Sequence, residues 1–161
     1  MFFGEYRHQL DEKCRIRIPA KLREDLGEKP FVMRGPNHSL IVLREADANA
    51  MLTSQFGDVD MVDPSEDNFT LRMLTSSAFF AEEDKQGRIL LPNKLLEHAG
   101  FKKKGSDEVN RNAVTIGALN RIEIWCESVW DGYYGDVPAE EFDKRLSERL
   151  KNKRANGGVK N

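Results

Sequence analysis

Asp11-Glu-Lys-Cys-Arg15-Ile-Arg-Ile-Pro19-Ala-Lys-Leu22 is the segment that decides the fold, because the chain contains it twice. The second copy, Asp84-Lys-Gln-Gly-Arg88-Ile-Leu-Leu-Pro92-Asn-Lys-Leu95, follows 73 positions later with Asp, Arg, Ile, Pro, Lys and Leu in register. Further along, residues 35–45 match residues 117–127 at an offset of 82. An ordered repeat of this extent indicates one supersecondary unit used twice. We therefore predict a pseudo-twofold arrangement of two similar halves.

Each half is predicted to contain four strands and a short helix. Apolar and polar residues alternate beside the repeated turn, as in half-buried strands, and a proline then ends the strand and begins a helix. The predicted strands lie at 5–10, 15–18, 31–33 and 40–43 and, in the second half, at 78–83, 88–91, 114–116 and 122–125. The predicted helices lie at 20–26, 45–56, 68–76, 92–99, 127–134 and 139–150.

The fold class that follows is α+β with a mainly β core. A four-stranded unit of this size leaves exposed strand edges, and pairing two such units within one chain covers them. We predict that the halves interlock and that the helices pack outside. The predicted divisions are a first repeat at 5–47, a helical and acidic connector at 48–76, a second repeat at 77–128, a C-terminal helical region at 129–150 and a disordered tail at 151–161.

The composition is that of a soluble globular protein. The chain has 161 residues, of which 39% are hydrophobic and 32% charged. No apolar run reaches the length of a membrane span, and the first residues lack the pattern of an export signal. Two cysteines are too few for a disulfide framework. We therefore expect a cytoplasmic protein with no membrane partner.

Charge is unevenly distributed along the chain, although the net charge is only −2. Residues 45–84 contain ten acidic residues and a single basic one, Arg72. The segments 7–23 and 85–104, which contain the repeated motif, are both net basic. Because the local field decides where a polyanion docks, these motif segments are the candidate surface for nucleic acid.

The arginine that ends each repeated turn is the candidate DNA-binding residue. Arg15 and Arg88 project from a rigid hairpin, and a guanidinium group offers a forked donor to phosphate or to guanine. The aspartate four residues earlier, Asp11 or Asp84, accepts N–H groups of the turn and braces the arginine. The alternative is that Asp and Arg only stabilise a turn; two copies in the same frame favour DNA binding. The flanking cations assigned to the same surface are Lys13, Arg17 and Lys85.

These residues resemble the MraZ family of bacterial transcription factors. The resemblance rests on Met1-Phe-x-Gly4-x-Tyr-x-His8-x-Leu10-Asp11-x-Lys13-x-Arg15-x-x-Ile18-Pro19-Ala20 and on the second Asp-x-x-x-Arg motif, and it spans residues 1 to about 150. It implies two AbrB-like swapped-hairpin repeats that interlock as a pseudo-dimeric β-barrel with peripheral helices. It also implies a ring-like homo-oligomer that is associated with the nucleoid. Such an oligomer is expected to bind direct repeats in double-stranded DNA upstream of the division and cell-wall gene cluster, including its own promoter.

The family's DNA-contacting arginines match Arg15 and Arg88, but one neighbouring position departs from the family pattern. The family usually has glycine before the first arginine, where this chain has Cys14, whereas Gly87 is retained in the second copy. If the position needs a positive φ, cysteine costs on the order of 1 kcal/mol there. Two interpretations of Cys14 stay open, a redox-active thiol and a neutral replacement for glycine.

The sequence contains no pattern typical of an enzyme or a metal site. It has no Gly-rich phosphate loop and no Gly-x-Ser-x-Gly motif, and its three histidines lack the spacing of metal ligands. We therefore predict no catalytic residue, metal, cofactor or small-molecule substrate. The predicted function is a sequence-specific DNA-binding transcriptional regulator. The alternative is a non-enzymatic protein-binding module, antitoxin-like or an assembly scaffold, on the same fold.

Overall fold

The computed structural model of the chain describes residues 1–157. The chain divides into a unit that spans Met1–Val129, which holds both sequence repeats, and a C-terminal unit from Trp130 onward. Within residues 1–157, no helix is both long enough and apolar enough to cross a membrane.

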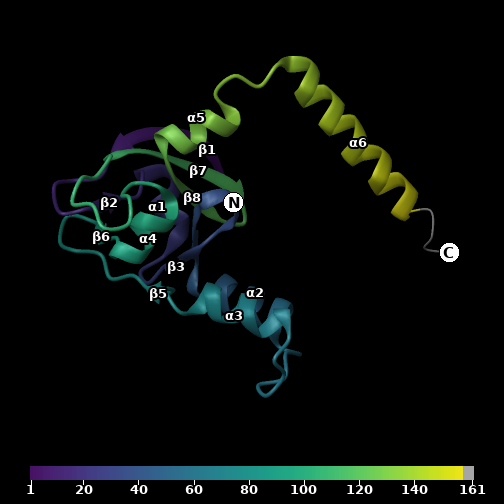
Figure 1. The fold of residues 1–161 in the computed structure, drawn as a ribbon. Helices are drawn as coiled ribbons and strands as arrows, with labels where there is room; N and C mark the ends of the chain where they lie inside the picture. The colour runs from purple at the N-terminus through teal and green to yellow at the C-terminus, as the bar shows by residue number, and fades with distance from the viewer. Residues whose placement is uncertain (158–161) are drawn as a thin grey trace. The chain divides into compact units, whose positions relative to one another are not determined.

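The first unit is built from short strands and helices in the order that the repeat predicts (Figure 1). The strands of the first half are β1 (Phe2–Gln9), β2 (Arg15–Arg17), β3 (Phe31–Arg34) and β4 (Leu40–Leu43). Those of the second half are β5 (Phe79–Phe80), β6 (Arg88–Leu90), β7 (Asn112–Leu119) and β8 (Ile122–Cys126). The helices are α1 (Ala20–Leu26), the 3-10 turn η1 (Pro36–His38), α2 (Glu45–Phe56), α3 (Glu66–Thr75) and α4 (Asn93–Ala99).

Strands of both halves are combined in one antiparallel sheet. Its order is β1-β7-β8-β4-β3-β5, and β2 and β6 form a separate two-stranded sheet. The first strand of each half pairs with the third strand of the other half, β1 with β7 and β5 with β3. The fourth strands, β4 and β8, pair with each other at the centre. This reciprocal pairing gives the unit its pseudo-twofold symmetry and interlocks the halves.

The predicted pseudo-dimeric β-barrel is not closed, because the six-stranded sheet is open. Its edge strands are β1 and β5, and β5 has only two residues where the sequence predicts six. Pro30 accounts for this short edge strand. Its carbonyl accepts a hydrogen bond from the Ala81 amide at 2.7 Å, but proline has no N–H to return one, so the ladder between β3 and β5 does not extend past Ala81.

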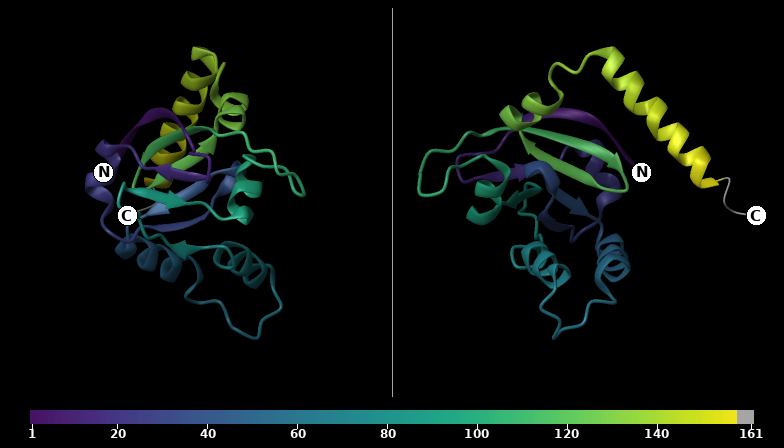
Figure 2. Two further views of the ribbon diagram at one scale, coloured as in Figure 1. Left: turned by 90° about the vertical axis from the view of Figure 1, so that its left-hand side faces the viewer. Right: turned by 45° about the vertical axis from the view of Figure 1, so that its right-hand side comes forward.

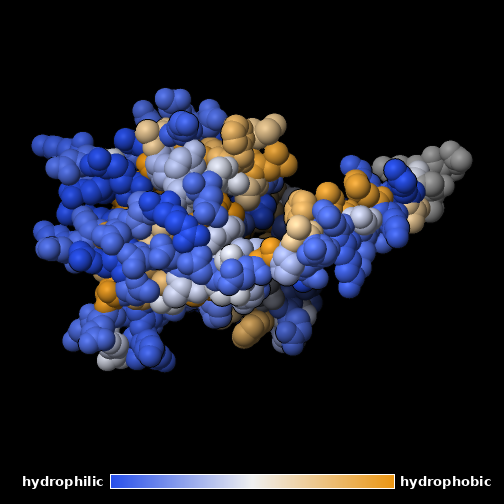
Figure 3. Space-filling view, turned by 90° about the horizontal axis from the view of Figure 1, so that it is seen from above, coloured by the Kyte–Doolittle hydropathy of each residue, from blue (hydrophilic) through white to orange (hydrophobic). Residues whose placement is uncertain are grey.

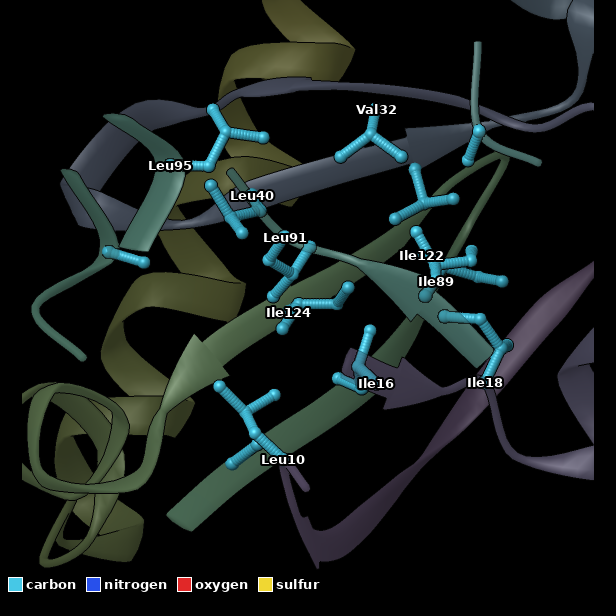
Figure 4. Packing of buried hydrophobic residues seen from close by; sticks show 14 of the residues in the cluster. Leu10, Ile16, Ile18, Val32, Leu40, Ile89, Leu91, Leu95, Ile122 and Ile124 are labelled. Atoms are coloured by element: carbon cyan, nitrogen blue, oxygen red, sulfur yellow. The ribbon is translucent and has the colours of Figure 1, made fainter. Parts of the chain in front are cut away.

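The hydrophobic core lies between the six-stranded sheet and the β2–β6 sheet (Figure 4). Both halves contribute to it, and Ile16 of β2 and Ile89 of β6 are its cross-strand pair on the small sheet. The repeated leucines Leu22 and Leu95 anchor helices α1 and α4 in the same core. The repeated apolar residues of the motif therefore hold the two-stranded sheet and its two helices in place.

Helices α2 and α3 lie side by side beyond the β3–β4 part of the sheet (Figure 2). They pack near a second, smaller apolar cluster made by Phe31, Met33, Ile41, Leu43 and Ala48. The strand residues of this cluster point to the face of the sheet opposite the main core, because side chains alternate along a strand. This part of the sheet is thus apolar on both faces.

Helix α5 (Glu127–Tyr134) begins in the first unit and ends in the C-terminal unit, which also contains α6 (Ala139–Gly157). In α5, the rings of Trp130 and Tyr134 lie one helical turn apart with centroids separated by 4.5 Å. Helix α6 extends through residues 151–157, where the sequence predicts a disordered tail. This segment has no proline, and its Lys, Arg and Ala residues are good helix formers. The remainder of the predicted tail, residues 158–161, lies outside the described residues.

Candidate nucleic-acid interface

The two Asp-x-x-x-Arg segments form the same tight turn. In the first turn, Asp11 Oδ1 accepts hydrogen bonds from the backbone amides of Lys13 at 3.0 Å and Arg15 at 2.9 Å. In the second, Asp84 Oδ1 accepts them from the amides two and four residues later, both at 2.9 Å. Each aspartate amide also donates to the carbonyl of its arginine at 2.9 Å. The aspartate therefore fixes the turn from which the arginine extends.

The residue before each arginine has a positive φ. Cys14 has φ 59° and Gly87 has φ 75°, so both copies need the left-handed conformation that glycine adopts without cost. At Cys14 a Cβ is accommodated, and the side chain packs against the main core. The first turn, with cysteine before its arginine, therefore has the same left-handed conformation at this position as the second turn has with glycine.

The two turns flank the small β2–β6 sheet, which we call the ribbon. Its register pairs Arg15 with Leu90 and Arg17 with Arg88, and because the strands are antiparallel the turns lie at its opposite ends. The isoleucines at the centre face the core. Alternation along each strand then places Arg15, Arg17, Arg88 and Leu90 on the opposite, outer face.

The four motif side chains form one network of ion pairs. Arg15 Nε lies 2.6 Å from Asp11 Oδ2, and Arg88 Nε lies 2.8 Å from Asp84 Oδ2. Each arginine also reaches the aspartate of the other turn, with Arg88 Nη1 at 3.2 Å from Asp11 Oδ2 and Arg15 Nη1 at 3.6 Å from Asp84 Oδ2. The two copies of the motif are thus joined across the ribbon into one unit.

Both carboxylates are held in their charged form by this arrangement. Partial desolvation raises the pKa of Asp11, but hydrogen bonds from the amide and side chain of Arg15 and from the Lys13 amide outweigh it and lower that pKa overall. The pKa of Asp84 is lowered mainly by the hydrogen bond from the Arg88 amide. Both aspartates therefore remain acceptors that orient the arginines at neutral pH.

The predicted site residues differ in how they are presented to solvent. Arg15 and Arg88 are only 26% and 22% exposed and lie at the base of their turns. The side chains of Lys13 and Lys85, which lie on the turns themselves, are exposed, and so is Arg17 on the outer face of the ribbon. The structure thus brings the two arginines together and places the two lysines at opposite ends of the ribbon.

Arg23 of α1 lies beside the second turn, although it was not among the predicted site residues. Its guanidinium forms an ion pair with Glu83 and lies over the second turn. A Cβ built on Gly87 would come within 2.6 Å of Arg23 Nη1 and 2.7 Å of Cζ. A comparison of the repeats could have pointed to Arg23. The equivalent position in the second copy is Leu96, a buried residue, so the charged residue is specific to the first copy.

We expect Gly87→Ala to destabilise the chain by about 1 kcal/mol or more, because alanine disfavours a positive φ and its Cβ would displace the Arg23 guanidinium. Urea unfolding followed by circular dichroism measures this change. Cys14→Gly is the matched control in the first turn, where no comparable loss is expected. Equal unfolding midpoints for Gly87→Ala and the unsubstituted chain would show that Arg23 does not constrain the second turn.

Two histidine side chains make hydrogen bonds away from the two turns, and neither cysteine forms a disulfide. His8 Nε2 lies 2.6 Å from Thr115 Oγ1, between β1 and β7, and His98 Nε2 lies 3.0 Å from the Gly35 carbonyl oxygen. Cys14 and Cys126 are free thiols, the second of them buried. Among residues 1–157, no three His, Cys, Asp or Glu side chains lie close enough together to hold a metal ion.

Comparison with known proteins assigns the chain to a family. The family described as "MraZ protein, putative antitoxin-like" matches residues 1–56 and 74–153. The chain belongs to the MraZ family. The match covers both Asp-x-x-x-Arg turns and every strand, and it omits only residues 57–73, which are acidic, between its two parts.

Curated relatives of the chain carry the name transcriptional regulator MraZ. The relative from Carboxydothermus hydrogenoformans is 34% identical over 152 residues, which cover 93% of this chain and 99% of the relative. That from Acetivibrio thermocellus is 36% identical over 149 residues, covering 91% and 97%. That from Halothermothrix orenii is 38% identical over 144 residues, covering 89% and 93%. The predicted family is confirmed, and it is a family of transcriptional regulators rather than enzymes.

Proposed function

We propose that this MraZ-family chain regulates transcription by binding double-stranded DNA with the outer face of the ribbon. One observation carries the proposal: both Asp-x-x-x-Arg turns converge on a single two-stranded antiparallel sheet with arginines on its outer face. The major groove of B-DNA admits a two-stranded β-ribbon. The ribbon is backed by buried isoleucines, so it presents its arginines from a rigid support.

The network of ion pairs leaves the arginines able to bind DNA. Asp11 and Asp84 engage Nε and Nη1 of Arg15 and Arg88, and each guanidinium carries five N–H donors in all. The donors on Nη2 supply the contact to guanine or phosphate in this proposal. Held side chains lose little conformational entropy on binding, which favours affinity. The more exposed cations, Lys13, Arg17, Lys85 and Arg23, contribute contacts to phosphate, which position the protein without reading sequence.

The proposal includes a homo-oligomer, which the binding energy requires. A good arginine contact gives roughly 1–3 kcal/mol of discrimination, whereas a dissociation constant of 1 nM corresponds to about 12 kcal/mol. Several tethered copies make the later contacts effectively intramolecular. A head-to-tail ring presents its ribbons in the same direction and therefore suits direct repeats, whereas a twofold dimer suits a palindrome.

The resemblance to the family supplies the finer parts of the proposal. We infer that the DNA repeats lie upstream of the division and cell-wall gene cluster, in the chain's own promoter, and that the protein acts in the cytoplasm at the nucleoid. A second candidate function is a protein-binding module. The family description "antitoxin-like" and the ion pairs already made by both arginines favour it, and a direct measurement of DNA contact separates the two.

Photo-crosslinking from the second turn tests this proposal. A benzophenone amino acid at Gln86, an exposed turn residue next to Gly87, is expected to crosslink to promoter DNA under ultraviolet light. The control is the same group at Met61, which is exposed in the acidic segment between α2 and α3. A crosslink from Met61 and none from Gln86 would place DNA on another surface and reject the ribbon. If no crosslink forms and no DNA is retained at low salt, the protein-binding module is favoured.

A further inference from the structure

The two ends of the ribbon differ in the segment that lies beside each turn. In the second half, α4 and β7 are joined by residues 100–111, which we call the basic loop. The Leu10 amide, directly before the first turn, donates to the Arg111 carbonyl at 2.8 Å, so the basic loop lies beside this turn (Figures 1 and 2). In the first half, α1 and β3 are joined by residues 27–30 alone, and this short connector bonds to Ala81, close to the second turn.

The basic loop has a fixed shape that presents its cations to solvent. Phe101, at its start, is 1% exposed and belongs to the main core. The Asn110 amide donates to the Phe101 carbonyl at 2.8 Å, and the Ser106 amide donates to the Lys103 carbonyl at 3.0 Å, which closes the tip. Lys103 and Lys104 are both exposed at this tip. A segment that is ordered before binding loses little conformational entropy when it contacts a partner.

Charge distinguishes the two ends of the ribbon. The basic loop contains four basic residues and two acidic ones, Asp107 and Glu108, whereas the short connector contains one of each sign. Glu82 and Glu83 precede the second turn, whereas the two equivalent residues before the first turn are uncharged. Figure 3, in which the side of the first unit that carries the turns again lies to the left, shows hydrophilic side chains over this margin. A polyanion is therefore attracted more strongly to the first-turn end of the ribbon.

The outer face of the ribbon is not symmetric either. Arg17 and Leu90 occupy equivalent positions of the two repeats, and both lie on the outer face. Arg17 pairs with Arg88, near the second turn, whereas Leu90 pairs with Arg15, near the first. The two orientations in which the ribbon can enter a groove therefore present different groups to the same bases.

We propose that the basic loop contacts the DNA phosphate backbone beside the first turn and thereby fixes the direction in which the ribbon lies on each DNA repeat. A pseudo-twofold ribbon otherwise has two orientations available in the major groove, related by a half-turn. Phosphate contacts set register and orientation without reading bases. A direct repeat has one direction, so a fixed orientation lets every copy of the chain read the same bases with the same turn. This inference rests on the proposed function and adds a direction to it.

The salt dependence of binding gives a first measurement. Lys103→Gln with Lys104→Gln removes two exposed charges at the tip of the basic loop and should leave the fold intact. The plot of the logarithm of the binding constant against the logarithm of the salt concentration should become shallower by roughly 0.9 for each lysine that contacts a phosphate. Lys151→Gln with Lys153→Gln, both exposed on α6, is the matched control, for which we expect an unchanged slope. A loop variant with the slope of the unsubstituted chain would contradict the phosphate contact.

Directed DNA cleavage from the two ends of the ribbon tests the direction itself. In a Cys14→Ser background, in which the natural Cys126 is buried, an iron chelate is attached to Asp107→Cys in the basic loop or to Gln86→Cys in the second turn. On promoter DNA that carries the repeats, we expect the loop chelate to cut one flank of each repeat and the turn chelate to cut the opposite flank. Equal cutting of both flanks from Asp107→Cys would show that the ribbon has no fixed direction and would overturn the proposal.

The two chelates also separate a failure of this proposal from a failure of the proposed function. Cutting from Gln86→Cys without cutting from Asp107→Cys would keep the ribbon on DNA and the basic loop away from it, which overturns the proposed direction alone. Cutting from neither position would reject the ribbon as the DNA-binding surface, and the proposed direction with it.

Discussion

Arg15→Ala combined with Arg88→Ala is expected to abolish specific DNA binding. Each arginine contact to a base or phosphate contributes roughly 1–3 kcal/mol, so the pair contributes roughly 2–6 kcal/mol per chain. This corresponds to a loss of at least about 30-fold in affinity, and an oligomer multiplies the loss across its copies. A gel shift with promoter DNA measures the effect. Circular dichroism and oligomer mass should stay unchanged, because both arginines lie on the outer face of the ribbon.

The control for this double variant removes two positive charges elsewhere. Lys29→Ala with Arg72→Ala changes exposed cations outside the ribbon and leaves the motif intact. We expect this variant to weaken DNA binding modestly and independently of base sequence, because it changes only the overall electrostatic field. If the Arg15 and Arg88 variant binds promoter DNA as tightly as the unsubstituted chain, the two arginines have a purely structural role in their turns.

Ile89→Ala is expected to destabilise the whole first unit by about 2–5 kcal/mol, the usual cost of truncating a buried isoleucine. Ile89 is 1% exposed and pairs across the ribbon with Ile16, and the resulting cavity would lie directly beneath the motif arginines. Urea unfolding measures the loss, and DNA binding should fall with it because the ribbon loses its rigid support.

Leu90→Ala is the matched control for this prediction, because it changes the adjacent residue on the outer face. Leu90 is 58% exposed, so its truncation should alter stability by no more than about 0.5 kcal/mol. Equal destabilisation by the two substitutions would mean that the ribbon is not anchored through its inner face.

The local pattern of the sequence predicted the elements of the fold better than their pairing. The alternation of apolar and polar residues, and the prolines that end strands, led to predicted bounds for α1, α2, α5 and β4 that agree with the observed ones. The strand β1 begins at Phe2, earlier than predicted, because its pairing with β7 extends to Leu119. That pairing joins residues more than one hundred positions apart, and no local periodicity encodes it. The short edge strand β5 likewise follows from a single residue, Pro30, whose effect depends on its partner strand.

The candidate site was predictable residue by residue but not as a network. The repeat identified Asp11, Arg15, Asp84 and Arg88, whereas the positive φ before each arginine was raised only as a condition and is given by the structure. Their mutual ion pairs depend on the antiparallel register of β2 and β6, which brings each arginine within reach of the other turn's aspartate. Arg23 was missed for a related reason, since its role over Gly87 arises from the packing of α1 beside the second half.

An anisotropy titration of the full chain on its own promoter most directly tests the claim that this protein reads DNA through repeated ribbons. The labelled duplex would carry the direct repeats, and a shuffled duplex of the same composition would be the comparison. We predict tight binding to the repeat duplex that weakens steeply between about 50 and 200 mM salt, roughly 10³-fold or more for six or more phosphate contacts, with much weaker binding to the shuffled duplex. Equal affinity for both duplexes, or no binding at the lower salt concentration, would contradict the claim.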